Sequence, residues 1–364
     1  MSPEAARQRA ALRLAFGATL ALVWGTIARE PLPGLTAVLA AQILVGMARP
    51  LRLGQAAAVL VVIAVTGGLT YAVGAAFADR PLILLAVLGL LFFLGFSMRE
   101  RAGGRPSLPA TMLLNATAVV PVLTVQAEML GAGVVETLVT AAARAMLVVW
   151  RLHAILPAPR EEPPAGGAPA DFASAGGTTV TRRSGVARTL AKVAIVLPAE
   201  FFYLTEPSAL AFPALLGLVT FLSTQDPAAG RAQLVILLLG NLVGSVSAAV
   251  AAAVFEVGPP LPALTLMGLI GGLGFAAWMV AKGRRPGGAV ALTGLVTFLM
   301  LFGLSASPTA FEVPVLDRII DIGVLSLYTI GATELLLPPP EPRSPAATAG
   351  GPADGSQTRP ASSA

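Results

Sequence analysis

Two long apolar blocks dominate this chain, and each is long enough to cross a lipid bilayer several times. About 20 apolar residues in a helix span a hydrocarbon core about 30 Å thick. The apolar runs are far longer than a barrel strand and lack its period-2 alternation, so helices are the expected spanning element. The sequence therefore predicts an all-α polytopic integral membrane protein with about 12 transmembrane helices. The expected spans are 12–28, 32–48, 55–78, 81–98, 108–130, 134–156, 187–204, 207–223, 232–256, 260–281, 287–304 and 314–337.

The composition agrees with this fold class. Hydrophobic residues make up 55% of the chain and charged residues 12%, and the mean hydropathy is +0.80. Soluble domains carry about 25% charged residues, so a soluble fold of this length could not cover its own apolar surface. The chain has no cysteine, which excludes disulfides, thiolate metal sites and cysteine nucleophiles.

The two apolar blocks also correspond to each other. Four short motifs recur in the same order at a nearly constant offset, which indicates duplication of a whole unit. The pairs are Arg29-Glu30-Pro31 with Thr205-Glu206-Pro207, Ala48-Arg49-Pro50 with Gln225-Asp226-Pro227, Leu94-Gly95-Phe96 with Leu273-Gly274-Phe275, and Arg105-Pro106 with Arg285-Pro286.

The loop charges predict the orientation. Of the 24 lysines and arginines, 20 fall on the side of the N-terminus, and only Arg29 and Arg80 fall in the opposite loops. Basic residues accumulate on the cytoplasmic side, so we expect both termini in the cytoplasm of a bacterial cell, with the chain in its inner membrane. Six spans per half give the two repeats the same orientation, which makes them parallel. This arginine-rich face also explains the net charge of +5 without a nucleic-acid partner.

Four regions follow from these patterns. We expect a first six-helix repeat over residues 1–156 and a second over 186–337. Residues 157–185 and 338–364 are rich in Pro, Gly, Ala, Ser and Thr, which predicts a disordered cytoplasmic linker and a disordered cytoplasmic tail.

Ionisable residues within the predicted spans are the first candidates for function, because a charge inside the bilayer marks a pathway or a buried pair. Arg144 lies near the middle of the sixth span, with Glu136 two turns away as a candidate partner. The twelfth span carries Asp317, Arg318 and Asp321. Arg318 could neutralise one carboxylate and leave the other to load and release a proton. The alternative is a structural, partly solvated cluster near the outer interface.

Two further carboxylates have the same ambiguity. Glu200 follows Pro198 in the seventh span, where a proline frees a backbone carbonyl and helps to form a site. Glu128 stands beyond Pro121 in the fifth span. Both could instead lie at the level of the lipid headgroups.

Small and amide residues have mainly packing interpretations. Gly240 and Gly244 form a GxxxG pattern, and Gly67 and Gly68 are expected at a similar tight crossing. Interhelical hydrogen bonds are expected for the amides of the apolar helices, with substrate contact as the alternative. These amides are Gln42, Asn115, Gln126 and Asn241.

Motifs of catalysis are missing from the sequence. His153 is the only histidine and has no carboxylate or thiol in register, so no metal site is expected. We find no P-loop, no Ser/His/Asp set and no HExxH motif, and we expect neither enzymatic activity nor a cofactor.

Six-plus-six parallel spans suggest the major facilitator superfamily, but its acidic signature loop is replaced here by Gly46-Met47-Ala48-Arg49-Pro50-Leu51-Arg52-Leu53-Gly54. The chain more closely resembles the fusaric acid resistance and aromatic acid exporter superfamily. The similarity lies in an arginine-flanked first helix, a Pro-containing turn, a small-residue second helix, a basic turn and a Gly-rich third helix. These are Leu12-Arg13-Leu14-Ala15, Pro31-Leu32-Pro33, Leu35-Thr36-Ala37-Val38-Leu39 and Leu51-Arg52-Leu53-Gly54, with Gly67-Gly68, and the second half echoes them.

The resemblance implies proton-driven efflux of small aromatic or other organic acids, with a periplasmic adaptor as partner. Typical members carry a sizeable cytoplasmic domain, so this chain resembles a short branch without it. Arg144 and Arg318 would attract an organic anion, and Asp317, Asp321 or Glu200 would couple protons. The alternatives are a non-transporting membrane subunit or scaffold of a larger complex, a major-facilitator-type permease, and an intramembrane enzyme on lipid-linked substrates. Assembly into a homo-oligomer is left open.

Overall fold

The computed structural model describes ten stretches of the chain, and every structural statement below concerns them. They are residues 3–46, 50–101, 107–126, 133–157, 182–205, 212–223, 227–256, 261–283, 286–305 and 315–336. Glu128, most of the predicted linker and the whole predicted tail lie outside the described residues.

The described residues form twelve helices and no strand. The helices of the first half are α1 Pro3–Ile27, α2 Pro33–Gly46, α3 Leu53–Phe77, α4 Pro81–Arg101, α5 Leu108–Gln126 and α6 Gly133–Ile155. Those of the second half are α7 Arg182–Thr205, α8 Phe212–Ser223, α9 Pro227–Glu256, α10 Leu261–Lys282, α11 Pro286–Ser305 and α12 Val315–Leu336.

Prolines mark several of the helix starts. Pro33, Pro81, Pro227 and Pro286 are each the first residue of a helix. At this position the missing N–H removes no hydrogen bond, and the fixed φ angle is already helical. The sequence therefore indicates where these helices begin.

Seven of the helices are long and apolar enough to cross a membrane, so the chain is a membrane protein with an all-α described part. They run over Arg7–Ile27, Leu53–Phe77, Pro81–Arg101, Gly133–Ile155, Val235–Val254, Leu261–Lys282 and Pro286–Ser305. In contrast, α2 has 14 residues and α8 has 12. At about 1.5 Å per residue, neither reaches across the hydrocarbon core by itself.

The helix pairs follow one pattern in both halves. Within the first half α1 packs on α2, α2 on α6, α3 on α5 and α6, and α4 on α5. Within the second half α7 packs on α8, α8 on α12, α9 on α11 and α12, and α10 on α11. Each of these pairs of the first half thus has a counterpart six helices later.

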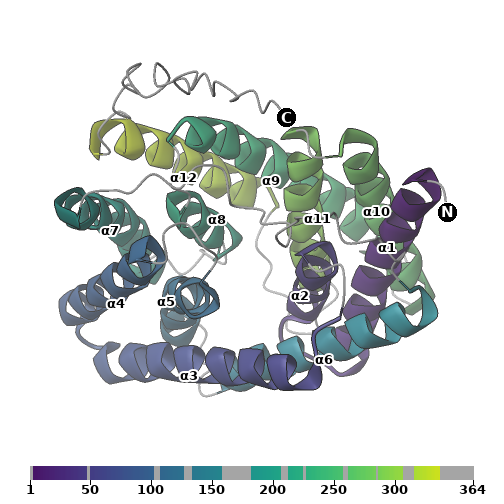
Figure 1. Cartoon of the computed structure of the whole chain (residues 1–364), viewed down its shortest axis with the longest axis horizontal. Helices are drawn as coiled ribbons and strands as arrows, with labels where there is room; N and C mark the ends of the chain where they lie inside the picture. Colours follow the sequence, from purple (N-terminus) through teal and green to yellow (C-terminus); the bar gives the residue numbers. More distant parts are fainter. Residues whose placement is uncertain are drawn as a thin grey trace, which may run out of the picture.

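The contacts between the halves repeat in the same way. Helix α1 packs on α10 as α7 packs on α4, and α2 packs on α11 as α8 packs on α5. Figure 1 shows α3 and α6 along one side of the molecule and α9 and α12 along the opposite side. The helices α2, α5, α8 and α11 lie between them and bring the two halves together.

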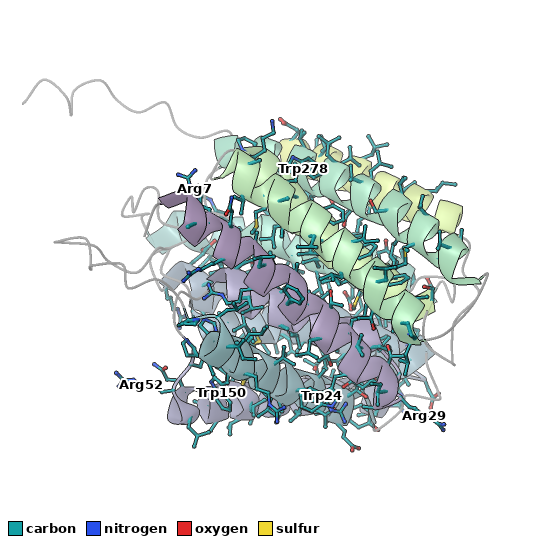
Figure 2. The ribbon with its side chains drawn as sticks, turned by 90° about the vertical axis from the view of Figure 1, so that its right-hand side faces the viewer. Arg7, Trp24, Arg29, Arg52, Trp150 and Trp278 are labelled. Atoms are coloured by element: carbon teal, nitrogen blue, oxygen red, sulfur yellow. The ribbon has the colours of Figure 1, made fainter. Side chains whose placement is uncertain are left out.

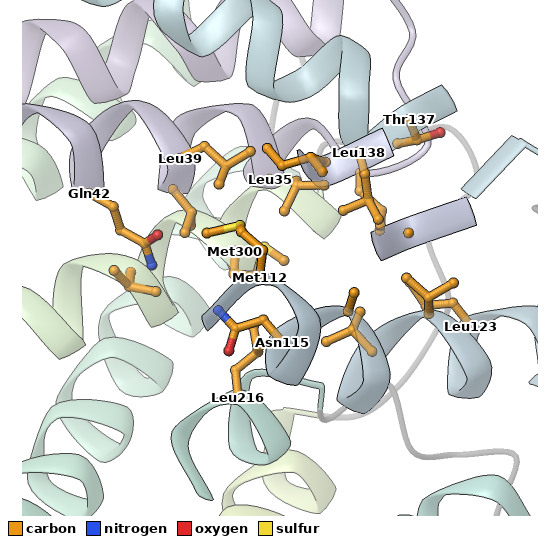
Figure 3. A pocket seen from close by; sticks show the side chains of 18 of the residues that line it. Leu35, Leu39, Gln42, Met112, Asn115, Leu123, Thr137, Leu138, Leu216 and Met300 are labelled. Atoms are coloured by element: carbon orange, nitrogen blue, oxygen red, sulfur yellow. The ribbon is translucent and has the colours of Figure 1, made fainter. Parts of the chain in front are cut away.

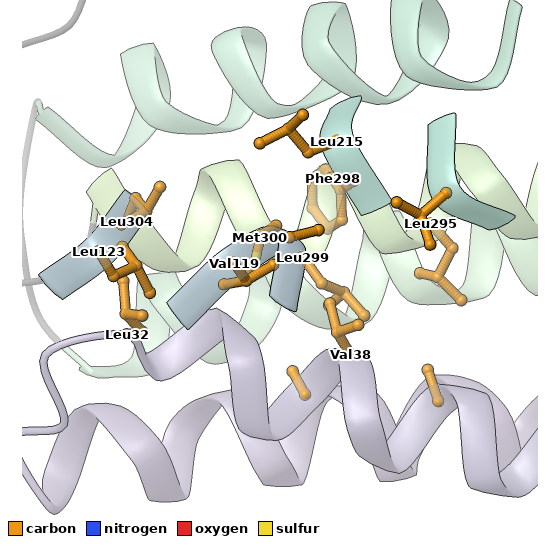
Figure 4. Close-up of a cluster of buried hydrophobic side chains, with 14 of the residues drawn as sticks. Leu32, Val38, Val119, Leu123, Leu215, Leu295, Phe298, Leu299, Met300 and Leu304 are labelled. Carbon is orange, nitrogen blue, oxygen red and sulfur yellow. The ribbon is translucent and has the colours of Figure 1, made fainter. Parts of the chain in front are cut away.

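These inner helices meet within the apolar core, to which the surrounding helices also contribute. Leu32, just before α2, meets Val38 of α2, Val119 of α5, Leu215 of α8 and Phe298 of α11 in one cluster of buried side chains (Figure 4). Glycines allow α2 and α11 to approach closely, because a Cβ on Gly303 would lie 2.5 Å from the Cα of Gly34. Small residues at a crossing let two helix backbones come into van der Waals contact. In lipid, such packing stabilises helix pairs because the hydrophobic effect does not drive helices together there.

Candidate functional site

A cavity of about 380 Å³ lies among the inner helices. Its walls come from α2, α3, α5 and α6 of the first half and from α8, α9 and α11 of the second. Cavities that hold small molecules measure about 300–1,000 Å³ and often lie between the helices of a bundle. The site is therefore large enough for one small organic molecule.

Most of the cavity wall is apolar. Leu35 and Leu39 of α2 face Met112 of α5, Leu216 of α8 and Met300 of α11 across the cavity (Figure 3). Methionine side chains adapt to irregular shapes, so this wall suits a ring or a branched carbon chain.

Seven side chains give the cavity hydrogen-bonding capacity, and all of them are uncharged. They are Gln42, Thr66, Asn115, Thr137, Asn241, Thr293 and Thr297. Gln42 and Asn115 lie at one end of the cavity, whereas Leu123, Thr137 and Leu138 lie at the other (Figure 3). The cavity thus has an amide end and a largely apolar end.

The amide end is open to a ligand. The side chains of Gln42 and Asn115 make no hydrogen bond to any described residue, and both remain accessible from the cavity. Asn241 differs, because its Oδ1 accepts a hydrogen bond of 2.5 Å from the hydroxyl of Thr297. That bond joins α9 to α11, as expected for an amide inside an apolar helix.

Arg144 is held by an acidic partner outside the cavity wall. Its guanidinium donates to Oε1 of Glu30, which follows α1, and the hydroxyl of Thr36 donates to Oε2 of Glu30 at 2.7 Å. Glu30 is 4% exposed and Arg144 28%. Glu136, the expected partner, is exposed in the first turn of α6, so that pairing is wrong. Glu30 and Arg144 are 114 residues apart, so sequence proximity does not identify the pair. The available signal is that Glu30 is an acidic residue at the edge of a predicted span.

Glu200 is fully buried in α7, where neither carboxylate oxygen has a hydrogen-bond partner among the described residues. Helix α7 packs on α4, α5, α8 and α12, and Glu200 is not part of the cavity wall. Asp317, Arg318 and Asp321 belong to α12, but their side chains lie outside the described part of the structure.

The glycine candidates differ in their surroundings. A Cβ on Gly240 would lie 2.5 Å from Cβ of Thr293, and one on Gly244 would lie 2.5 Å from the carbonyl oxygen of Gly294, so both face α11 at close range. Gly67 lines the cavity with ordinary contacts to Val135 of α6. A Cβ on Gly68 would meet open space, so the tight crossing expected there is wrong. Adjacent helical residues point about 100° apart, which explains why the two neighbours differ.

A second ionic cluster joins α4 to α7. The ammonium of Lys192 lies 3.3 Å from Oε1 of Glu100, and the hydroxyl of Thr189 donates to Oε2 at 3.0 Å. Arg99 donates to the hydroxyl of Thr111 and to the carbonyl oxygen of Ser223, both at 3.0 Å. These contacts tie α4, α5, α7 and α8 together. The sequence places Arg99 and Lys192 on the arginine-rich side of the predicted spans. It does not identify the residues that they contact.

Comparison with known proteins adds one finding. The model of a family described as "Protein of unknown function (DUF2955)" matches residues 10–151, which run from α1 into α6. No curated protein matches the chain. The part of the chain that the structure describes also contains no group of three His, Cys, Asp or Glu side chains that could hold a metal ion.

Proposed function

We propose that this protein is a secondary transporter of the bacterial inner membrane that exports small organic molecules through the central cavity, driven by the proton gradient. The observation that carries the proposal is a cavity walled by both halves, with two side-chain amides free to bind a ligand. The resemblance implies aromatic and other organic acids as cargo. The cavity itself supports the wider class of molecules with an apolar body and a hydrogen-bonding end.

The proposed architecture is twelve spans in two parallel six-helix repeats. The helix pairs that recur six helices later support this arrangement, as do the recurring sequence motifs. Transporters built from repeats hold their substrate where the repeats meet and expose it alternately by rocking one repeat against the other. Here α2, α5, α8 and α11 would form that meeting point.

The proposed orientation has both termini in the cytoplasm. Figure 2 supports it, because Arg7 and Arg52 lie toward one end of the helices and Arg29 lies toward the other. Arginines concentrate on the cytoplasmic side of a membrane protein. Gln42 lies in the last turns of α2 and Asn115 in the first half of α5, which puts the amide end nearer the cytoplasm in this orientation.

The test is flux in liposomes that contain the purified protein and carry a proton gradient across the membrane. Aromatic and aliphatic acids, amides and phenols are added, and collapse of the gradient is followed with a pH-sensitive dye. We expect substrate-dependent collapse in the wild type and a loss of about tenfold or more in Gln42→Leu and Asn115→Leu, because each removes a hydrogen bond worth about 1.4 kcal/mol.

Gln55→Leu is the matched control, because Gln55 lies on α3 outside the cavity and accepts a hydrogen bond from the backbone N–H of Arg52. It should keep wild-type flux. Absence of flux for every compound in wild-type protein that is folded and correctly inserted would overturn the proposal.

A further inference from the structure

We infer that the central cavity selects uncharged molecules and rejects ionised acids. This inference rests on the proposed function of the cavity, and it defines the class of substrate that the cavity takes. A weak acid would be bound only in its protonated form, whereas amides, alcohols and phenols would be bound directly.

The polar side chains of the cavity wall are all uncharged. The polar groups that line the cavity are carboxamides and hydroxyls, and no described residue in the wall carries a charge. Gln42 and Asn115 each offer one carbonyl acceptor and two N–H donors. Such groups match a neutral partner that both donates and accepts, such as a primary amide, a phenol or an un-ionised carboxyl group.

The guanidinium of Arg144, on a helix that lines the cavity, is already paired. Arg144 stands on α6, the helix that gives Val134, Thr137 and Leu138 to the wall, but it is not part of the wall. Its charge is already balanced by Glu30, whose second oxygen is occupied by Thr36. An anion in the cavity would therefore find no counter-charge among the described residues of the wall, and Arg144 on the adjoining helix is already paired.

Dehydration costs an ionised ligand far more free energy than a neutral one. An ionised carboxylate loses strong hydration when it enters an apolar site, and it is buried in proteins only when it is paired. Hydrogen bonds from neutral amides return only part of that loss. A neutral polar group loses far less hydration, and the amide end can restore its hydrogen bonds in full.

The experiment measures equilibrium binding to the full-length protein in lipid nanodiscs with three probes of one shape. Benzamide is uncharged, benzenesulfonate is anionic at every pH used, and benzoic acid changes its charge with pH. Each is titrated from about pH 4 to about pH 8, and benzamide at each pH corrects for any titration of the protein itself.

We expect benzamide to bind with a Kd that is nearly independent of pH, and Asn115→Leu to weaken it about tenfold while Gln55→Leu does not. Benzenesulfonate should bind at least about 100-fold more weakly than benzamide. The apparent Kd of benzoic acid should rise about tenfold per pH unit above its own pKa.

The outcomes separate the inference from the function on which it rests. Benzenesulfonate within about tenfold of benzamide, or benzoic acid with a constant Kd across the series, would overturn charge selection alone. Failure of all three probes to bind a folded protein would overturn both charge selection and the cavity as a site for aromatic molecules.

Discussion

Arg144 in the middle of α6 donates to Glu30, a residue 114 positions earlier in the connection between α1 and α2. The hydroxyl of Thr36, in the first turn of α2, donates to the other oxygen of the same carboxylate. Helices α2 and α6 both give side chains to the cavity wall. The contacts of Glu30 with Arg144 and Thr36 therefore hold these two helices at a fixed spacing. We therefore expect Arg144 to position the proposed site, whereas the sequence suggested that it attracts the substrate.

Loss of one partner from this pair should destabilise the protein. Arg144→Met leaves the buried carboxylate of Glu30 without its counter-charge, which costs about 3 kcal/mol. The double variant Glu30→Gln/Arg144→Met should recover part of that loss, because no buried charge remains unpaired. Thermal unfolding in detergent measures the effect, with Arg151→Met as the exposed control. Equal midpoints for the wild type and Arg144→Met would show that the pair does not stabilise the fold.

The two classes of glycine predict opposite responses to enlargement. Gly244→Val should destabilise the protein by about 2 kcal/mol or more, because its side chain would meet the backbone of α11 at Gly294. Gly68→Val should leave stability within about 0.5 kcal/mol, because open space faces it. Yields of folded protein and unfolding temperatures are compared side by side. Tolerance of both changes would contradict the close crossing of α9 and α11.

The bond between Thr297 and Asn241 should appear as an energetic coupling. In a double-mutant cycle with Thr297→Val and Asn241→Leu, we expect a coupling between about 0.6 and about 1.7 kcal/mol, which are the average and the maximum for interhelical hydrogen bonds in a membrane. Thermal unfolding of the four proteins gives the value. Additive effects of the two single changes would mean that the bond does not join the helices.

The orientation can be tested with single thiols, because the chain has no cysteine of its own. Arg80→Cys should react with a membrane-impermeant maleimide in intact spheroplasts. Arg52→Cys should react only after the membrane is opened. Both arginines are exposed, so access depends on the side of the membrane. Labelling of Arg52→Cys in intact spheroplasts would reverse the proposed orientation.

The positions of the helices could be predicted because they depend on local features. Each predicted span overlaps one helix of the described residues, since apolar runs and prolines such as Pro81 and Pro286 mark their limits in the sequence itself. Whether all of them cross the membrane stays a prediction. The repeat also stays a prediction, although the helix pairs that recur six helices later support it.

The site could not be predicted because it depends on contacts between distant segments. Glu30 and Arg144 are 114 positions apart, so the sequence favours the nearer Glu136 as the partner of Arg144. Gln42 and Asn115 are ordinary amides in apolar helices until α2 and α5 close around a shared space. Their free hydrogen-bonding groups, more than the charged residues, define the candidate site.

We propose that substrates pass through the cavity. The most direct test is a single cysteine in place of Ala116, a residue of the cavity wall on α5, with Leu90→Cys on the exposed face of α4 as the control. In proteoliposomes, benzamide should slow the modification of Ala116→Cys by a bulky thiol reagent, and the modified protein should lose its flux. Modified Leu90→Cys should keep its flux. Full flux through a protein whose Ala116→Cys is completely modified would contradict the account.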